Sequence, residues 1–587
     1  MSRVRSARVS RFGLALASAA VLALGAASPY AQGQAQPQTQ KPAPPVALKD
    51  LRTQAEQSGW KEYTSHENMW TYLQAVQARS TEVRLGTYGE THQGRKLPYL
   101  IYSRPTVTQP WEAWALNKPV VVLAANVHGG ERTLRESVLV LVRELAERGS
   151  DANRLLDDLV VIVVPQINPD GFEADPNPTR GNAWGLDLNR DYAKLEQPEI
   201  QSYVQNVILK WAPHVFIDGH NGGAFPYNLN YQCHSHAAPD PRITLLCDQQ
   251  IFPAINKRLE AEGFKAWYYQ NGNEKEWRTG GFEMRIGRNY GGFANSVGIL
   301  FESPGGQPME TAVRAGLLGY KAVVEWSRSN KAMLVETIAR ARRETIEKGE
   351  KPGDQFAVRV RYEAEDYPVN YLIGVGQGTE RKVQEVKGAR LIKKPVPTIL
   401  RQRPYAYILP REATEAVALL QRHGITVERL QQSTPMRVQA YTIGNVSYSQ
   451  VYNHASTVQV EVKDVIDLDR TFPAGTYVVR TAQMQGRVAA QLLEAESDDN
   501  VIYWNRMDAW IPRPGATAAA PDPDDAPAVT GAGAAGARGA GAGGGRAAGA
   551  GARGGGAGGG RGGGQVQPPL VPIFKLMAPT PLPLRVQ

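Results

Sequence analysis

A histidine and a glutamate three residues apart stand where an apolar run gives way to a helical pattern. The stretch "VVVLAANVHGGERTLRESVLVLVREL", residues 120–145, contains His128 and Glu131 between the run "VVVLAA" and apolar residues at helical spacing. At such a junction the two side chains can point toward one spot, and zinc favours imidazole and carboxylate ligands. The spacing by itself is weak, because a capping or buried histidine occurs there in many proteins.

A catalytic zinc site needs a third protein ligand and an open position for water. We expect His220 in "FIDGHNGG" to be that ligand, because it ends a later apolar strand and has glycines beside it that allow close approach. His214 opens the same strand and therefore lies at its other end. His234 and His236 fall in a polar loop and are expected to be solvated.

The elements that must position these side chains alternate along residues 51–350. Apolar strand-like runs are separated by helical patterns, in the order "VVVLAA", helix 132–148, "LVVIVV", helix 197–211, "HVFIDGH", "GILFES" and a long charged helix from about 308. This alternation predicts an α/β fold with a mixed, mostly parallel sheet and helices on both faces. Functional sites in such sheets gather at the carboxyl ends of the strands. His128, Asn168, His220 and Glu302 all follow or end such a run.

The stretch "NPDGFEADPNPTRGNAWGLDLNRDY" adds further motifs in a fixed order. Together with the HxxE pair, the later histidine and the glutamate of "GILFESPGG", it resembles the zinc carboxypeptidases of the carboxypeptidase A/B type, in an exported bacterial form with an extra C-terminal domain. The resemblance covers about residues 80–330, and "LGTYGETHQGRKLPYLIYS" is similar to the family's N-terminal hairpin. It implies one Zn²⁺ per chain and hydrolysis of the last peptide bond of peptides with a free C-terminal carboxylate.

The resemblance implies roles around the metal. His128, Glu131 and His220 would be the metal ligands. Asp187 of "LDLNR" would accept a hydrogen bond from the first histidine and so fix its ring. Glu302 would take a proton from the attacking water and pass it to the leaving amine. The alternative for Glu302 is a structural role, as a glutamate in an ion pair.

The resemblance also implies which residues hold the substrate. Asn189 and Arg190 would bind the terminal carboxylate, for which a guanidinium offers a planar fork. Arg180 would polarise the scissile carbonyl and hold the charge that develops on it; otherwise it is a surface arginine.

The family's tyrosine, which covers the bound carboxylate, is harder to place. We choose Tyr290, although it stands closer to the catalytic glutamate than in the pancreatic members, and Tyr268 and Tyr269 remain alternatives. Arg285 and Arg288 are close in sequence. Either could favour an acidic terminal side chain, or both could be solvated.

The composition divides the chain further. We expect six segments: a signal peptide at 1–31, a linker at 32–50, the catalytic domain at 51–350, a β-rich domain at 354–513, a flexible Gly/Ala-rich linker at 514–565, and a tail at 566–587. The β-rich domain has one expected helix in "REATEAVALLQRHG", and the tail is apolar enough to return to this domain as a strand. The signal predicts export to the periplasm or outside the cell, with no membrane span once it is removed.

The charge balance and the cysteines restrict the partners. The formal charge is +9, but four arginines lie in the signal segment and four in the Gly/Ala-rich tract, so the rest is nearly neutral. A nucleic-acid partner is therefore not expected. Cys233 and Cys247 could form one disulfide in an exported chain, or stay free.

Two other functions stay open at this level. A deacylase of N-acyl amino acids belongs to the same superfamily, but the complete "NPDG" and "DLNR" block disfavours it. A non-catalytic binding or adhesion protein on a peptidase fold is disfavoured because the polar positions of the mechanism are all filled.

Overall fold

A mixed eight-stranded sheet is the centre of the computed structural model, which describes residues 47–376, 381–451, 453–512 and 569–586. Its strand order is β1-β2-β4-β3-β5-β10-β6-β7, with parallel pairing of β4, β3, β5 and β10 in its middle. The strands are β1 (Val83–Glu90), β2 (Lys96–Tyr102), β3 (Val120–Ala125), β4 (Val160–Val164), β5 (Val215–Asn221), β6 (Leu229–Cys233), β7 (Ala266–Tyr268) and β10 (Val297–Ser303). The predicted mixed, mostly parallel α/β sheet is therefore confirmed.

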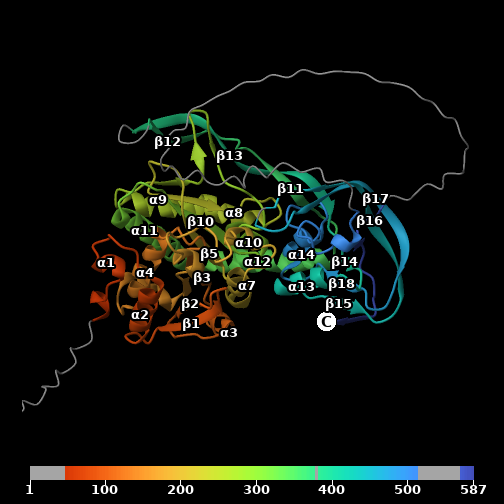
Figure 1. Cartoon of the computed structure of the whole chain (residues 1–587), viewed down its shortest axis with the longest axis horizontal. Coiled ribbons are helices and arrows are strands. Elements are labelled where there is room, and N and C mark those ends of the chain that lie inside the picture. The colour runs from red at the N-terminus through yellow and green to blue at the C-terminus, as the bar shows by residue number, and fades with distance from the viewer. Residues whose placement is uncertain (1–46, 377–380, 452, 513–568, 587) are drawn as a thin grey trace, which may run out of the picture. The chain divides into compact units, whose positions relative to one another are not determined.

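Helices cover both faces of this sheet (Figure 1). The middle strands are buried along their whole length, which agrees with their unbroken apolar runs. The helices of this part are α1 (Gln54–Gln57), α2 (His66–Gln77), α3 (Pro110–Ala115), α4 (Thr133–Ala146), α5 (Asp151–Arg154), α6 (Pro169–Phe172), α7 (Pro198–Tyr203), α8 (Pro241–Leu246), α9 (Phe252–Glu260), α10 (Gly287–Phe293), α11 (Met309–Ser329) and α12 (Lys331–Glu350). Short 3-10 or π-helical turns are η1 (Leu48–Asp50), η2 (Leu155–Asp157), η3 (Leu188–Arg190), η4 (Val204–Leu209) and η5 (Cys247–Ile251).

The alternation of side chains along β3 sorts the core into two layers. Val121, Leu123 and Ala125 pack with α2, α4, α8, α9, α11 and α12. Val120 and Val122 face the other way, into a layer that includes α7 and α10. Within the described residues, no helix is both long and apolar enough to span a bilayer.

Most expected elements of this part are confirmed, with small shifts at their ends. The hairpin forms from β1 and β2, and the helix expected at 132–148 is α4. The helix expected at 197–211 is α7, which continues into the wider turn η4. The long helix expected from about 308 is two helices, α11 and α12, which meet at Asn330.

A second sheet joins the chain after residue 354 to the part before it. Its order is β11-β13-β9-β8, with β12 paired to β13, and β9 lies before α10 in the chain. Figure 1 shows β13 running from the β12 hairpin toward β11. The strands are β8 (Asn271–Gly272), β9 (Glu276–Arg278), β11 (Gln355–Ala364), β12 (Val369–Val375) and β13 (Lys382–Gln402).

A third, seven-stranded sheet holds the end of the chain. Its order is β17-β16-β19-β14-β18-β15-β20, and β19 pairs with β14 and β16, so the predicted return of the tail as a strand is confirmed. The elements are β14 (Ala406–Leu409), α13 (Thr414–Arg422), β15 (Glu428–Leu430), β16 (Thr434–Tyr448), β17 (Val458–Phe472), β18 (Tyr477–Arg480), α14 (Gly486–Leu493), η7 (Asp508–Trp510), β19 (Phe574–Leu576) and β20 (Leu584–Val586). Helix α13 was expected, whereas α14 was not.

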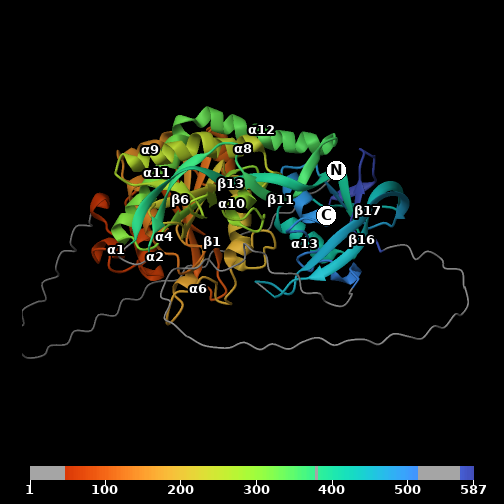
Figure 2. The ribbon, with the colours of Figure 1, turned by 90° about the horizontal axis from the view of Figure 1, so that it is seen from above.

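The part after residue 354 shares its core with the central sheet. The buried apolar side chains that pack with α7 and α10 form one continuous cluster with residues of α13, α14, β14 and β18. Figure 2 shows α12 extending from the helices over the central sheet toward β11. The expected signal peptide and the whole Gly/Ala-rich linker at 514–565 lie outside the described residues.

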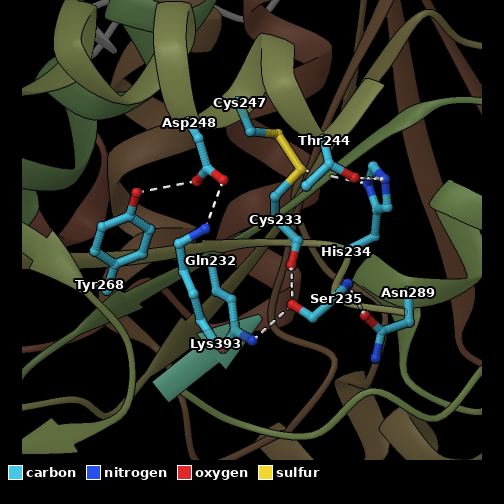
Figure 3. The surroundings of a disulfide bond; sticks show 10 residues. All are labelled: Gln232, Cys233, His234, Ser235, Thr244, Cys247, Asp248, Tyr268, Asn289 and Lys393. Atoms are coloured by element: carbon cyan, nitrogen blue, oxygen red, sulfur yellow. Dashed lines mark hydrogen bonds and ion pairs between the residues drawn. A yellow bond between two sulfur atoms is a disulfide. The ribbon is translucent and has the colours of Figure 1, made fainter. Parts of the chain in front are cut away.

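Cys233 and Cys247 form a disulfide, which answers a question that the sequence left open. The bridge joins Cys233 at the end of β6 to Cys247 of η5 (Figure 3). Next to it, Asp248 accepts hydrogen bonds from Tyr268 and from Lys393 of β13. These contacts fix β6 beside its neighbours.

Candidate metal centre

Three predicted ligand residues meet at the carboxyl end of the central strands. His128 Nδ1 lies 2.9 Å from Glu131 Oε1, and His220 Nδ1 lies 2.8 Å from Glu131 Oε2. The two histidine Nδ1 atoms are 3.1 Å apart. One ligand atom from each residue falls within 4.8 Å of the others, and two imidazole nitrogens with one carboxylate are a donor set that suits zinc.

The loop between β3 and α4 is shaped by its own side chains. Asn126 has a left-handed backbone with φ of 61°, and its Nδ2 donates to the carbonyl groups of His128, Gly129 and Glu131. Gly129 has no room for a side chain, because a Cβ there would lie 2.1 Å from the carbonyl carbon of Gly171. The loop is therefore held by backbone packing as well as by hydrogen bonds.

Each histidine also has an aspartate at its other ring nitrogen. Asp187 Oδ1 lies 2.9 Å from His128 Nε2, as expected from the resemblance. Asp218 Oδ2 lies 3.0 Å from His220 Nε2, although the two groups are not aligned as a hydrogen bond. A carboxylate in this place fixes the ring and leaves the Nδ1 atom free to bind a metal.

The charges of this group stabilise one another. Burial favours neutral Glu131, but the two histidines outweigh it and hold the pKa of Glu131 well below its usual range. Burial also opposes a charge on His220, yet Asp218 and Glu131 raise its pKa well above the ordinary value. Such a negative surrounding favours a bound cation.

Glu302 lies next to His220 across the sheet. In the register of β5, β10 and β6, Glu302 pairs with His220 on one side and with Asn230 on the other. Its Oε2 is buried without a hydrogen-bond partner among the described residues. Burial raises the pKa of Glu302 to about 8, with Glu131 adding to the rise and His220 and Arg180 opposing it. A carboxylate in this setting is suited to exchange a proton near neutral pH.

Arg180 lies at the edge of the same group. Its Nε donates to Asp187 Oδ2 at 2.9 Å, and its Nη1 donates to Glu131 Oε1 at 3.0 Å. About half of the side chain, 48%, remains exposed. Arg180 therefore presents a positive charge beside the metal ligands and remains reachable from solvent.

Asn189 and Arg190 follow Asp187 on η3. The Asn189 Nδ2 lies 3.4 Å from His220 Nε2, and Asn189 Oδ1 accepts a hydrogen bond from the backbone of Gly287. Arg190 is half-buried, and its Nη1 donates to the carbonyl of Asn189. Asn189 therefore lies against a metal-facing histidine, and the charge of Arg190 helps to lower the pKa of Asp187.

The structure does not bring Tyr290 to the metal centre. It is fully buried on α10, and its hydroxyl is bonded to His423 Nδ1 on the far side of the sheet layer, so the choice of Tyr290 needs correction. Tyr269, one of the two alternatives, lies near the site. Burial raises the pKa of its phenol, and the charges of Glu302 and Glu131 raise it further.

The competing histidines have other roles. The backbone N–H of Val120 donates to His214 Nδ1, at the opposite end of β5 as expected. His234 and His236 are buried, so their expected solvation is wrong; burial lowers the pKa of each to about 3. His234 lies beside the disulfide, with Nε2 at 2.9 Å from Thr244 Oγ1 (Figure 3).

Arg285 and Arg288 are both buried, but among the described residues only Arg285 has an acidic partner. Arg285 forms an ion pair with Asp499 at 3.1 Å and contacts Tyr503, so it joins α10 to the chain that follows α14. Arg288 donates to the backbone carbonyls of Gly280 and Gly281. The idea that either is solvated is wrong.

The sequence did not point to Asp218, and it left Tyr269 as one of two alternatives. Asp218 stands two positions before His220 on a strand, so the two side chains share a face, and this spacing could have identified it. Tyr269 lies in the turn after β7, and no local pattern distinguishes it from Tyr268.

Residues 69–280 match the family model described as zinc carboxypeptidase. The chain is 26% identical over 449 residues to a protein named Carboxypeptidase 2 from Trichophyton equinum, covering 70% of this chain and 78% of that protein. It is 29% identical over 215 residues to Carboxypeptidase D of Drosophila melanogaster, covering 31% of this chain and 15% of that one. All three proposed metal ligands lie within the matched range.

A solved structure is also similar. It is described as a metallo-carboxypeptidase from Pseudomonas aeruginosa in complex with (2-guanidinoethylmercapto)succinic acid, with 20% identity and a TM-score of 0.37. The similarity covers 46% of this chain and 70% of that chain.

Proposed function

The chain carries a zinc carboxypeptidase domain, and from this premise we propose that it removes the last residue of peptides that end in a free carboxylate. One observation carries the proposal: a His–Glu–His group, a buried glutamate and Arg180 meet at one end of the central sheet, and the charge of Arg190 acts on Asp187 beside them. Hydrolysis of a C-terminal peptide bond needs each of these parts.

His128, Glu131 and His220 would hold one zinc ion per chain. When bound, zinc acts as a Lewis acid that activates water and polarises the scissile carbonyl. Asp187 is hydrogen-bonded to His128 Nε2 and Asp218 lies close to His220 Nε2, so the Nδ1 atom of each ring would be free to bind the metal.

Glu302 is the proposed general base. Its carboxylate accepts a proton from the attacking water and then gives it to the nitrogen of the leaving amine, so that no proton is left over. One carboxylate can do both steps, because the proton that it takes from the water is released again to the leaving nitrogen.

Three residues would bind the two polar groups of the substrate's last residue. Arg180 would bind the scissile carbonyl, and Asn189 and Arg190 would bind the terminal carboxylate. Arg180 places a positive charge where negative charge develops on the carbonyl oxygen. Arg190 would form two parallel hydrogen bonds to the terminal carboxylate, with Asn189 beside it. We assign the tyrosine that covers this carboxylate to Tyr269.

The segment limits and the location of the protein are part of this proposal. We propose residues 51–350 as the catalytic domain, 354–513 as a β-rich domain, and 1–31 as a signal peptide that directs export to the periplasm or outside the cell. The basis for the signal peptide is the sequence alone.

The test compares an N-blocked peptide with its C-terminal amide on zinc-loaded protein. We expect the amide to be cleaved at least about 100-fold more slowly, because Arg190 loses the charged partner that the terminal carboxylate supplies. Equal rates would contradict the exopeptidase mechanism. Faster cleavage of N-acyl amino acids would favour the deacylase.

A variant separates the catalytic function from binding alone. Glu302→Gln keeps the size of the side chain and leaves the three ligands in place, so bound zinc should equal that of the parent. Turnover should fall by about 10²–10⁴-fold, the range for a positioned acid–base group. If the parent protein binds zinc but cleaves neither peptides nor N-acyl amino acids, the result would favour the non-catalytic binding protein.

A further inference from the structure

Arg288 is a buried arginine without a described acidic partner. Its side chain is almost fully enclosed, with 3% of the residue exposed, and its Nη2 donates to two backbone carbonyls, those of Gly280 and Gly281. Its Nε is buried without a partner. Its Nη1 makes no bond within the described residues and is not enclosed, so it keeps contact with solvent. The open edge of the guanidinium can therefore reach a ligand.

The register of the sheet places this arginine beside the metal centre. Glu302 lies between His220 and Asn230, and two residues earlier Leu300 lies between Asp218 and Gln232, on the same face of the sheet. The row with Glu302 and the row with Leu300 are therefore neighbours on this face. Arg288 lies close to the row with Leu300.

Two sets of contacts connect Arg288 to the row with Leu300. Gln232 exchanges two hydrogen bonds with Gly280, whose carbonyl also accepts from Arg288. On the other side, Gly287 packs so closely on Asp218 that a Cβ there would lie 2.8 Å from the carboxylate. Arg288 thus lies over the sheet one row away from the proposed general base.

The proposed carboxylate-binding residues are also adjacent to Arg288. Asn189 Oδ1 accepts a hydrogen bond from the backbone of Gly287, the residue before Arg288. Tyr269 packs on Gly280, since a Cβ there would lie 2.9 Å from its ring. The charge of Arg288 also acts on the Tyr269 phenol, together with that of Glu302. A single amino acid held by Asn189 can therefore direct its side chain toward Arg288.

A buried cation without a counter-charge is costly, and two carbonyl groups compensate only part of the lost hydration. Arg285, three residues earlier, has a carboxylate partner from the same chain, whereas Arg288 lacks one among the described residues. We propose that the side-chain carboxylate of the substrate's last residue is the counter-charge of Arg288, so that the enzyme prefers peptides ending in glutamate or aspartate. This inference rests on the proposed function.

The test uses two N-blocked dipeptides that differ only in ending with glutamate or glutamine. These residues have the same shape, so the ratio of their kcat/KM values reports the charge alone. We expect the parent to prefer glutamate by about 10- to 100-fold, the range for a hydrogen bond to a charged group. Equal cleavage, or a preference for glutamine, would overturn the inference while leaving the carboxypeptidase proposal intact.

Arg288→Met removes the charge at similar volume and should bring the ratio close to one. Arg278→Met is the matched control, because Arg278 is exposed on β9 and pairs with Glu276; it should keep the parental ratio. Zinc content of all three proteins shows whether the site has folded. A ratio unchanged in a zinc-binding Arg288→Met protein would overturn the inference.

A binding measurement separates this inference from the proposed reaction. Free glutamate should raise the melting temperature of zinc-loaded parent protein more than free glutamine does, and Arg288→Met should abolish the difference. If no peptide is cleaved but this difference is present, the proposed reaction fails and the anion site stands. Equal shifts by the two amino acids in the parent would contradict the anion site.

Discussion

At the scale of single residues, each of the two metal-facing histidines has a carboxylate next to its other ring nitrogen. His128 and His220 both turn Nδ1 to the common point, and each has an aspartate about 3 Å from Nε2. Asp187 reaches its histidine from a separate loop, whereas Asp218 precedes His220 on the same strand. The second arrangement depends only on the alternation of β5, so it forms whenever the strand forms.

We predict that Asp218→Asn lowers zinc affinity by about 10- to 100-fold, the range for removing the partner of a metal-binding histidine. The amide keeps the shape but no longer offers a negative charge to the Nε2 proton. Zinc affinity is measured by competition with a chelator, which does not depend on activity. Asp366→Asn, at an exposed acid far along the chain, is the control and should match the parent. Parental affinity in Asp218→Asn would show that Asp218 does not position His220.

At the scale of elements, α13 is tied to the central sheet by a neutral histidine at its end. Tyr290 of α10 lies with its hydroxyl 3.0 Å from His423 Nδ1, and His423 Nε2 lies 3.0 Å from the carbonyl of Ala193. The hydroxyl donates to Nδ1 and Nε2–H donates to the carbonyl, which uses both nitrogens of a neutral ring. Burial lowers the pKa of His423 to about 4, and the Ala193 carbonyl offsets part of the effect.

We predict that acid weakens the fold through His423. Its folded pKa, about 4, is below the unfolded value near 6.5, so between these pH values the unfolded chain binds the proton and the folded chain does not. The stabilisation is complete above pH 6.5 and is lost as pH falls toward 4. At pH 5.5 the loss should be about 1.4 kcal/mol. Urea unfolding at pH 7.5 and 5.5 measures it.

In the variant His423→Gln, the part of the pH dependence of the unfolding free energy that comes from His423 should be absent. Tyr290→Phe is the matched control, because it removes the hydroxyl and leaves the histidine buried. The control should keep most of the parental difference between the two pH values. An identical pH dependence in the parent and in His423→Gln would contradict the role of His423.

At the scale of the whole molecule, the end of the chain is part of the fold. Lys575 of β19 lies 2.7 Å from Glu494 and donates to the hydroxyl of Tyr441 at 2.8 Å, and all three are shielded from solvent. Tyr441 and Tyr407 both donate to Glu494. Burial lowers the pKa of Lys575, but Glu494 opposes that change. The tail therefore supplies the counter-charge of a buried carboxylate.

We predict that Lys575→Ala lowers the free energy of unfolding by about 3–5 kcal/mol, because it leaves Glu494 buried without its partner. Urea unfolding monitored by tryptophan fluorescence measures this change. Lys394→Ala, which breaks an exposed ion pair with Asp366, is the control and should have little effect. A small effect of Lys575→Ala would show that the tail is dispensable for stability.

The sequence alone predicted the α/β class, the order of the main strands along the chain, and the meeting of His128, Glu131 and His220 at one point. These features follow from local patterns: apolar runs, helical spacing and motifs at strand ends. Such patterns depend on neighbours along the chain, so they can be read without knowing how distant segments meet. The same holds for the return of the tail, whose apolar residues predict burial.

Only the tertiary structure showed that Tyr290 and Arg285 are bonded to distant segments and so turn away from the metal centre. Each contact depends on which distant segment lies opposite: Tyr290 meets His423, and Arg285 meets Asp499, both from the part after residue 354. The burial of residues such as His234 has the same origin. Contacts of this kind are set by the pairing of strands and by the packing of one segment on another, and no local pattern records them.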